Sequence, residues 1–370
     1  TGPAGCGKTY LLNKYISYLR DNNIAVGVTA STGIASTHLD GRTIHSWCHM
    51  GISENMTDPQ IKKLLENENL WTRVSYASVL IIDEVSMLNA RRLDLADRIC
   101  KIIRQDHRPF GGMQVILCGD FFQLPPVTKE GEDGRFVSES NVWNEMDIKI
   151  CYIEEQFRQE DKRFLRILND IRADRVSAET SKILEGRLNK EVEIDMLPTK
   201  LFTHNEDVDA YNLFELNKLK TSEQIYEMQS NGVPHLVKKL KENCIANEIL
   251  KVRIEAIVMF VKNNYDKGYV NGTLGRVINF DEESGYPMVR TIAGKVILCH
   301  PESWKLEDGG RTIASISQIP LRLAWAITVH KRQGMSLDCA EIDVSGTFEY
   351  GMGYVALSRV RSLNGIKLTG

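Results

Sequence analysis

The chain has 370 residues, of which 42% are apolar and 26% charged, a composition typical of a globular protein with two or three domains. Its 46 basic and 49 acidic residues leave a net charge of -3, which excludes the strongly basic proteins that coat nucleic acid but not a local basic groove. No apolar run has the length needed to span a bilayer, so no membrane partner is expected. None of the eight cysteines lies in a CxxC pair or at a zinc-ligand spacing, which favours a reducing, intracellular compartment.

The first third of the chain alternates amphipathic helices with short apolar strands. Apolar residues at helical spacing mark helices over 11–19 and 93–103. Continuous apolar runs, typical of strands buried on both faces, predict strands at 24–29, 79–83 and 115–118. This order predicts a domain over 1–150 built on a parallel sheet with helices. The pattern at about 51–75 is polar and irregular, and we expect a small insert here that departs from the first sheet.

A second α/β domain is predicted over 151–370. Its first half should contain strands around 149–153 and 199–203 and helices near 161–172 and 205–217. From 255 to 318 the period changes to short strands separated by Asn-Gly, Ser-Gly and Ala-Gly turns, which predicts a small antiparallel barrel inserted in this domain. Its strands are expected at 257–261, 274–280, 288–292 and 295–299. The helix and strand pattern resumes at Pro320.

The segment GPAGCGKT at 2–9 fits the pattern GxxxxGK[ST]. Its glycines let the backbone curl so that N–H groups face phosphate oxygens, and the helix that follows adds the positive end of its dipole. Lys8 would neutralise the β- and γ-phosphates, and Thr9 would place its hydroxyl on Mg²⁺. The sequence therefore predicts an ATP site formed by Gly2, Pro3, Ala4, Gly5, Cys6, Gly7, Lys8, Thr9 and Tyr10.

Three further residues at strand ends suit nucleotide hydrolysis. Asp83 and Glu84 end the apolar strand 79–83, at the sheet edge where parallel sheets bind ligands. Asp83 would hold Mg²⁺ through water, and Glu84 would orient and deprotonate the attacking water. Gln123, in the loop after the third strand, could sense the γ-phosphate. The alternatives are a solvated Asp-Glu turn and an ordinary loop in which one of the two phenylalanines before Gln123 belongs to the core.

Taken in order, the motifs of the chain resemble those of the Pif-one family of superfamily 1B DNA helicases, of bacterial type, with RecD-like relatives. The similar segments are 2–9, 30–35, 43–46, 82–87, 119–127, 155–159, 323–334 and 354–361, and 93–104 is similar to the segment that sets the group apart. Departures are small: Cys6, Ser31 and Arg332 stand where the family usually has other residues, and none removes a charge or hydroxyl that the chemistry needs.

The resemblance implies two RecA-like P-loop domains, with a small wedge insert in the first and an SH3-like β-barrel insert in the second. It implies that Arg158 and Arg359 are arginine fingers on the γ-phosphate, and that Gln333 and Gly334 lie on the nucleotide side of their motif. It also implies a monomeric motor whose contacts with single-stranded DNA come from Thr29, Ser31, Thr32, Thr43, His45, Ser46, Thr203, His204, Asn205, His330 and Lys331. Taken singly, these polar residues could instead cap helices, and each arginine could form a surface ion pair.

The sequence therefore predicts an ATP-dependent DNA helicase that uses Mg²⁺, moves 5′-to-3′ on single strands and unwinds forked or structured DNA. The direction follows from the resemblance alone. Two alternatives stay open: the helicase part of a RecD-type recombination or conjugation machine, and a P-loop ATPase that acts on a protein partner without unwinding DNA.

Overall fold

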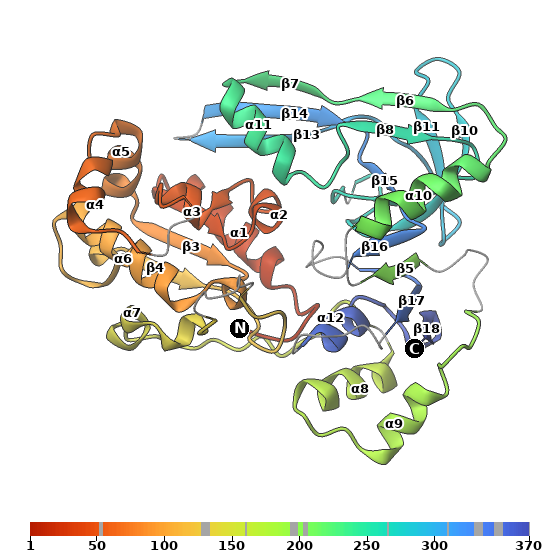
Figure 1. The fold of residues 1–370 in the computed structure, drawn as a ribbon, viewed down its shortest axis with the longest axis horizontal. Coiled ribbons are helices and arrows are strands. Elements are labelled where there is room, and N and C mark those ends of the chain that lie inside the picture. The colour runs from red at the N-terminus through yellow and green to blue at the C-terminus, as the bar shows by residue number, and fades with distance from the viewer. Residues whose placement is uncertain are drawn as a thin grey trace. The chain divides into compact units, whose positions relative to one another are not determined.

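The computed structural model describes residues 1–51, 55–126, 134–159, 161–192, 199–202, 206–264, 266–308, 311–328, 336–343 and 351–369. They form two compact units (Figure 1). Unit 1 comprises Thr1–Gln156 and Lys305–Ile313, and unit 2 comprises Phe157–Trp304 and Ala314–Gly370. In the described part of the chain, no helix has the combined length and apolar character that a bilayer crossing requires.

Unit 1 is built on a four-stranded parallel sheet with the order β2-β1-β3-β4. The strands are β1 (Val26–Ala30), β2 (Arg42–Thr43), β3 (Val79–Asp83) and β4 (Gln114–Leu117). The helices are α1 (Lys8–Asp21), α2 (Gly33–Thr37), α3 (Ile44–Trp47), α4 (Asp58–Leu64), α5 (Glu68–Tyr76), α6 (Ala90–Arg104) and α7 (Asn141–Glu145). The parallel α/β fold predicted for this region is confirmed, with strand ends displaced by one or two residues.

Helices cover both faces of this sheet. Leu12, Ile16 and Leu19 of α1 pack with Val79 and Ile81 on one face. The alternate residues of β3 point to the other face, where they join apolar side chains of α3, α4, α5 and α6. Because β3 is buried on both sides, each of its five residues is at most 3% exposed. The carboxyl end of β3 is thereby held rigidly at the edge of the sheet.

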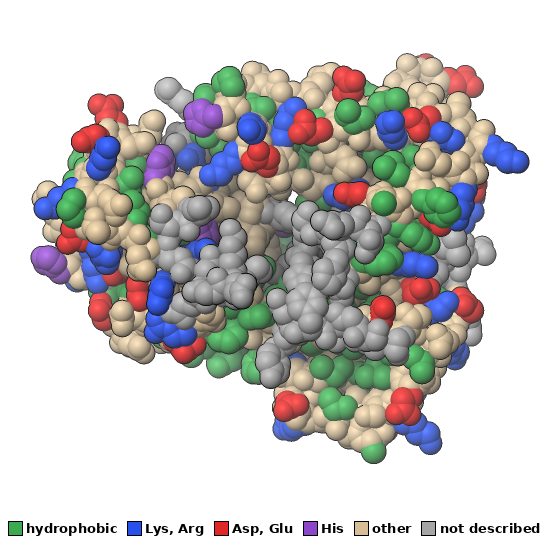
Figure 2. Space-filling view, in the orientation of Figure 1, with side chains coloured by type: hydrophobic (Ala, Val, Ile, Leu, Met, Phe, Trp, Pro, Cys, Tyr) green, Lys and Arg blue, Asp and Glu red, His purple; other side chains and the backbone are tan. Residues whose placement is uncertain are grey.

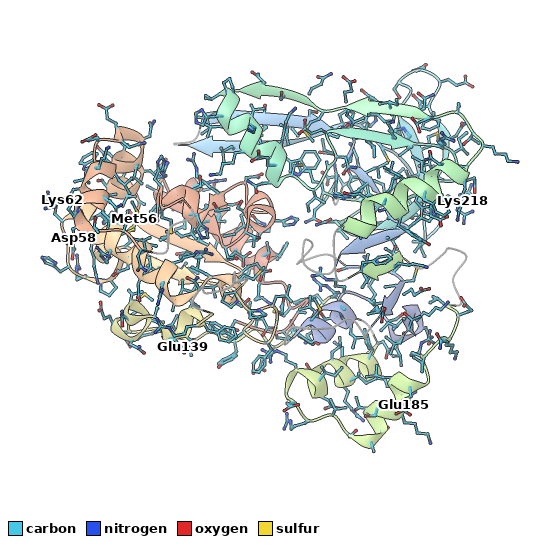
Figure 3. All side chains as sticks on the ribbon, viewed as in Figure 1. Met56, Asp58, Lys62, Glu139, Glu185 and Lys218 are labelled. Carbon is cyan, nitrogen blue, oxygen red and sulfur yellow. The ribbon has the colours of Figure 1, made fainter. Side chains whose placement is uncertain are left out.

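Within the insert expected at about 51–75, the described residues form the helices α4 and α5, for which the sequence showed no clear period. The amide of Thr57 donates to Gln60 Oε1 at 2.8 Å at the start of α4, and Asn67 Oδ1 accepts from the Leu70 amide at 2.9 Å at the start of α5. Figure 3 labels Met56, Asp58 and Lys62 at the α4 end of unit 1. Each helix is so short that it buries only one or two apolar residues, and the sequence pattern therefore lacks a visible period.

Unit 2 contains a second parallel sheet with the order β16-β5-β17-β18. Its strands are β5 (Thr199–Phe202), β16 (Ala326–Thr328), β17 (Ala340–Asp343) and β18 (Ile366–Thr369). The helices are α8 (Lys162–Arg172), α9 (Ala178–Glu185), α10 (Glu206–Lys218), α11 (Pro234–Asn243) and α12 (Met352–Ser358). The strand predicted near 199–203 and the helices predicted near 161–172 and 205–217 are confirmed.

The strand predicted at 149–153 is wrong. This segment belongs to unit 1 and forms no assigned strand; instead the Thr1 amine donates to the Cys151 carbonyl and the Ile153 amide donates to the Thr1 carbonyl, both at 2.8 Å. Ile150 is 60% exposed and Tyr152 is 69% exposed, so the apolar run here does not mark a buried strand.

The antiparallel insert of unit 2 is confirmed. Its main sheet has the order β12-β11-β10-β9-β15. These strands are β9 (Ile257–Phe260), β10 (Leu274–Phe280), β11 (Pro287–Thr291), β12 (Val296–Leu298) and β15 (Leu321–Leu323). Further antiparallel strands are β6 (Gln224–Glu227), β7 (Gln229–Gly232), β8 (Ile249–Val252), β13 (Glu302–Asp308) and β14 (Arg311–Gln318). Antiparallel pairing thus extends beyond the 255–318 range on both sides.

Candidate functional site

The glycine loop of unit 1 has the backbone that phosphate binding requires. Gly5 and Gly7 adopt positive φ angles of 80° and 85°, a region that other residues rarely occupy, and α1 begins directly afterwards at Lys8. Lys8 Nζ donates to the Gly2 carbonyl at 2.8 Å and to the Pro3 carbonyl at 2.9 Å, which holds the ammonium over the loop. An ammonium group and the N-terminus of a 14-residue helix therefore meet at one place.

The residues expected to hold magnesium are brought together. Thr9 Oγ1 donates to Asp83 Oδ2 at 3.3 Å, across 74 residues of sequence. Burial raises the pKa of the Asp83 carboxyl, whereas the Glu84 amide, the Cys118 thiol, the nearby Lys8 ammonium and the Thr9 hydroxyl lower it. The Thr9 hydroxyl and the Asp83 carboxylate are oxygen ligands of the kind that Mg²⁺ prefers, and the Lys8 ammonium can neutralise phosphate charge. These residues therefore fit a magnesium triphosphate.

Glu84 has an unusual backbone conformation for a residue with a long side chain. Its φ of 52° and ψ of 45° place it in the left-handed region, which costs about 1–3 kcal/mol for a residue other than glycine. The Glu84 amide donates to Asp83 Oδ1 at 2.9 Å, and the Ser31 hydroxyl donates to the Glu84 carbonyl at 2.7 Å. The ends of β1 and β3 therefore fix where the Glu84 side chain starts.

Gln123 is buried and bonded to a residue that sequence reasoning had given no role. Gln123 Nε2 donates to Asp120 Oδ2 at 3.3 Å, and the backbone amide of Gln123 donates to the Asp120 carbonyl at 3.0 Å. Asp120 is fully buried, and its position directly after a strand was the only sequence signal that could have identified it. Phe121 packs edge-on against aromatic rings of unit 1, whereas Phe122 is 53% exposed, which confirms that one of the two belongs to the core.

The polar residues of unit 1 predicted to contact DNA have different environments. Thr29 is fully buried and its hydroxyl donates to the Ile81 carbonyl at 2.6 Å, which contradicts its predicted contact with DNA. The Ser31 hydroxyl is also used inside the unit, on Glu84. Thr32 caps α2 by accepting from the Ala35 amide at 3.3 Å, and Thr43 caps α3 by accepting from the Ser46 amide at 3.2 Å, so the capping alternative is observed at both.

Seven candidates of the second domain lie outside the described residues. These are Thr203, His204, Asn205, His330, Lys331, Gln333 and Gly334. Basic and acidic side chains are interspersed over the face of each unit drawn in Figure 2. An open pocket of about 530 Å³ lies at α4 and at the connection between α4 and α5 in unit 1, but its lining contains none of the candidate residues.

Unit 2 brings the two predicted arginine fingers onto one segment. Arg158 Nη1 donates to the Ser358 carbonyl at 3.2 Å, directly before Arg359 at the end of α12. The buried amide of Gln159 donates to the carbonyls of Ser358 at 2.7 Å and Val360 at 3.2 Å, a role that sequence reasoning missed although Gln159 lies in the same motif. Arg359 is 2% exposed, which excludes the alternative of a surface ion pair for it.

Comparison with known proteins shows which family this chain is similar to. Residues 1–192 match the family described as PIF1-like helicase, and residues 235–280 match the domain described as DNA helicase Pif1, 2B domain. The ATP-dependent DNA helicase Pif1 of Psychrobacter sp. is 41% identical, with 100% of this chain and 65% of that protein aligned. The chain thus spans slightly less than two thirds of this curated relative.

Solved structures agree with the sequence comparison. Unliganded Pif1 from Bacteroides sp. superposes with a TM-score of 0.83 at 32% identity, over 100% of this chain and 87% of that one. Bacteroides Pif1 in complex with ADP-AlF3 and ssDNA superposes with a TM-score of 0.61 at 31% identity, over 99% and 87% of the two chains. The fold is therefore the α/β architecture with two RecA-like domains and inserts that the sequence predicted. The chain belongs to the PIF1-like helicase family.

Proposed function

We propose that this chain hydrolyses ATP with Mg²⁺ and uses the energy to move 5′-to-3′ along single-stranded DNA and to unwind duplexes. The observation that carries the proposal is the contact of Thr9 with Asp83 beside the Lys8 ammonium, where the start of α1 meets the carboxyl end of β3. The solved complex of a family member with ADP-AlF3 and ssDNA supports the nucleotide and the nucleic acid as ligands.

Each residue of unit 1 has a distinct chemical role in this proposal. Lys8 and the loop amides bind the β- and γ-phosphate oxygens. Thr9 and Asp83 hold Mg²⁺, which supplies charge neutralisation between the phosphates when bound. Glu84 accepts the proton of the attacking water, and its fixed backbone determines where its side chain starts. Gln123, held by Asp120, responds to the γ-phosphate.

Arg158 and Arg359 act in this proposal as fingers on the γ-phosphate, with an effect on the rate of about 10³–10⁵. Their shared attachment to Ser358 supports a joint role, since one movement of this segment displaces both guanidinium groups. Arg359 is 2% exposed, so its guanidinium has already lost most of its hydration. The desolvation free energy of moving it onto a phosphate is therefore smaller than for a solvated arginine.

The DNA track is proposed from hydroxyl, amide and cationic side chains that hold a strand without reading its sequence. On unit 1 these are Thr32, Thr43, His45 and Ser46, at the amino-terminal ends of α2 and α3. We propose that forked and structured DNA are substrates and that the chain works as a monomer. We also propose that it works in a reducing compartment, which its eight free cysteines support.

Two assays test the proposal: ATP hydrolysis with and without oligo-dT, and unwinding of forks that carry only a 5′ or only a 3′ tail. We expect strong DNA stimulation and unwinding from the 5′ tail alone. Lys8→Ala and Arg359→Ala should abolish turnover while DNA affinity stays within a few-fold. Lys14→Ala, on the exposed face of α1, is the matched control and should leave turnover unchanged.

Other outcomes point to specific alternatives. Turnover that does not respond to DNA would indicate an ATPase acting on a protein partner. Unwinding from the 3′ tail alone would overturn the proposed direction. Turnover in Arg359→Ala at the wild-type rate would remove the finger role from the proposal while leaving the nucleotide site of unit 1 intact.

A further inference from the structure

We infer that Asp338 is a positioning residue that ties the antiparallel insert of unit 2 to the segment carrying Arg359, so that the insert controls where this finger lies. Asp338 precedes β17 and lies outside every residue set assigned above. The inference rests on the proposed role of Arg359 in ATP hydrolysis.

The carboxylate of Asp338 is shared between two parts of the unit. Asp338 Oδ1 accepts from Arg361 Nη1 at 2.9 Å, two residues after Arg359. The backbone amide of Leu274, the first residue of β10 in the insert, acts on the same carboxylate and lowers its pKa. Both contacts favour the charged carboxylate and lower its pKa, against the larger effect of burial, which raises it. One side chain therefore joins the insert to the finger segment.

Main-chain hydrogen bonds also hold residue 337 against the backbone from Arg359 to Arg361. The Leu337 amide donates to the Arg359 carbonyl at 2.7 Å, and the Arg361 amide donates to the Leu337 carbonyl at 3.0 Å. The backbone at Arg359 is thus clamped to residue 337, and the next residue along, Asp338, holds Arg361. Any displacement of 337–338 is passed to the backbone of Arg359.

The insert also presses on this segment through its Asn-Gly turn. Gly272 has a φ of 97°, and a Cβ placed on it would lie 2.2 Å from the Ser336 carbonyl oxygen, so the two backbones are in direct contact. The Gly272 amide donates to the Phe260 carbonyl at 2.8 Å, which anchors the turn to β9. The insert therefore meets 336–338 at both the turn and the start of β10.

These contacts give the insert mechanical control of a residue that acts in the transition state. A finger displaced by about 1 Å can cost on the order of 10²-fold in rate while ground-state binding changes little. Loss of the Asp338 charge should therefore lower kcat and leave the KM for ATP and the affinity for DNA nearly unchanged. A purely structural role predicts instead a lower thermal midpoint with normal kcat at temperatures where the protein is folded.

The first test compares Asp338→Asn with Asp170→Asn in the full chain. Asp170 is a matched control because it is also partly buried in unit 2 and accepts a hydrogen bond, from Thr180 at 3.0 Å, but its contacts lie within α8 and α9. With saturating oligo-dT and well below the lowest thermal midpoint, we expect kcat to fall about 10- to 100-fold in Asp338→Asn and less than 2-fold in Asp170→Asn. The KM for ATP should change less than 3-fold in both.

The second test approaches the same contact from the insert. Gly272→Ala adds a methyl group against Ser336, whereas Gly294→Ala adds one at a φ of 81° with open space around it. Both substitutions carry similar backbone strain, so a difference between them reports the contact. We expect kcat to fall at least 5-fold in Gly272→Ala and to stay within 2-fold in Gly294→Ala. This pair decides the question even if Asp338→Asn does not fold.

The outcomes separate the inference from the function on which it rests. If Arg359→Ala abolishes turnover but Asp338→Asn and Gly272→Ala both keep wild-type kcat, the coupling is absent and the finger role stands. If Arg359→Ala retains turnover, the finger role itself fails. If kcat in Asp338→Asn equals the wild-type value once it is calculated per folded molecule, and only the thermal midpoint is lower, Asp338 is only a stabilising residue and the inference is overturned.

Discussion

Arg104, at the end of α6, should stabilise unit 1 more than any exposed arginine on the same helix. Its Nε donates to the Gly111 carbonyl at 2.6 Å, and its Nη1 donates to the carbonyls of Val74, Ser75 and Ala77 at 3.0, 2.9 and 2.8 Å. The carbonyls of Val74 and Ser75 lie in the last turn of α5, where helical carbonyls have no partner within the helix and carry the negative end of the dipole.

The magnitude follows from the number of independent bonds. Hydrogen bonds to a charged group contribute about 1.5–3 kcal/mol each, but the three carbonyls share one nitrogen and cannot count separately. Taking one bond at Nη1 and one at Nε, Arg104→Ala should cost about 3–6 kcal/mol. For a unit of this size that corresponds to a thermal midpoint lower by roughly 6–24 °C. Arg104→Lys should recover at most half of the loss, because an ammonium lacks the planar fork.

Thermal unfolding followed by circular dichroism measures this effect. The control is Arg98→Ala, on the same helix, since the Arg98 side chain is 43% exposed and pairs with Asp58, which is 65% exposed. Such exposed pairs contribute about 0–1 kcal/mol, so the control should lower the midpoint by only a few degrees. A midpoint in Arg104→Ala as high as that of Arg98→Ala would refute the reasoning.

Two further predictions concern catalysis and pH. Glu84→Gln should lower kcat about 10²–10⁴-fold without loss of stability, because the backbone bonds of Glu84 to Asp83 and Ser31 do not involve its side chain; a kcat within 3-fold of wild type would remove Glu84 as the base. Burial lowers the pKa of His38 to about 4, so the unfolded chain takes up a proton below about pH 6.5 that the folded state refuses. The contribution of neutral His38 to the free energy of unfolding should therefore be present in full above about pH 6.5 and should fall as the pH drops towards 4. The loss attributable to His38 should reach about 2 kcal/mol at pH 5 and vanish in His38→Gln, as measured by urea unfolding at pH 8 and pH 5; an equal pH dependence in both proteins would contradict it.

Local sequence determined the parts of this protein whose signal lies within a few residues. The strand 79–83 was predicted at its observed bounds, because a strand covered on both faces needs an unbroken apolar run. The glycine loop was predictable because only glycine readily adopts the positive φ found at Gly5 and Gly7. The turns of the insert were predictable for the same reason, with positive φ at Gly272, Gly285 and Gly294.

Tertiary structure decided how polar side chains are used. Thr29 carries the hydroxyl expected of a DNA contact, yet its strand lies inside the sheet and the hydroxyl turns to a neighbouring carbonyl. The exposed run at 149–153 looks apolar enough for a strand, and its hydrogen bonds run to Thr1 instead. Whether a polar or apolar residue is buried depends on which elements pack over it, and this packing involves residues far away in the chain.

The contacts that matter most for the proposed mechanism are also the most distant in sequence. Gln159 and Arg158 reach Ser358 across about 200 residues, and Thr9 reaches Asp83 across 74. No local pattern encodes such pairs, because each partner satisfies its own helix, strand or loop equally well without the other. The sequence alone therefore supplied the chemical groups and the elements that carry them, whereas the folding of those elements against one another determined which groups meet.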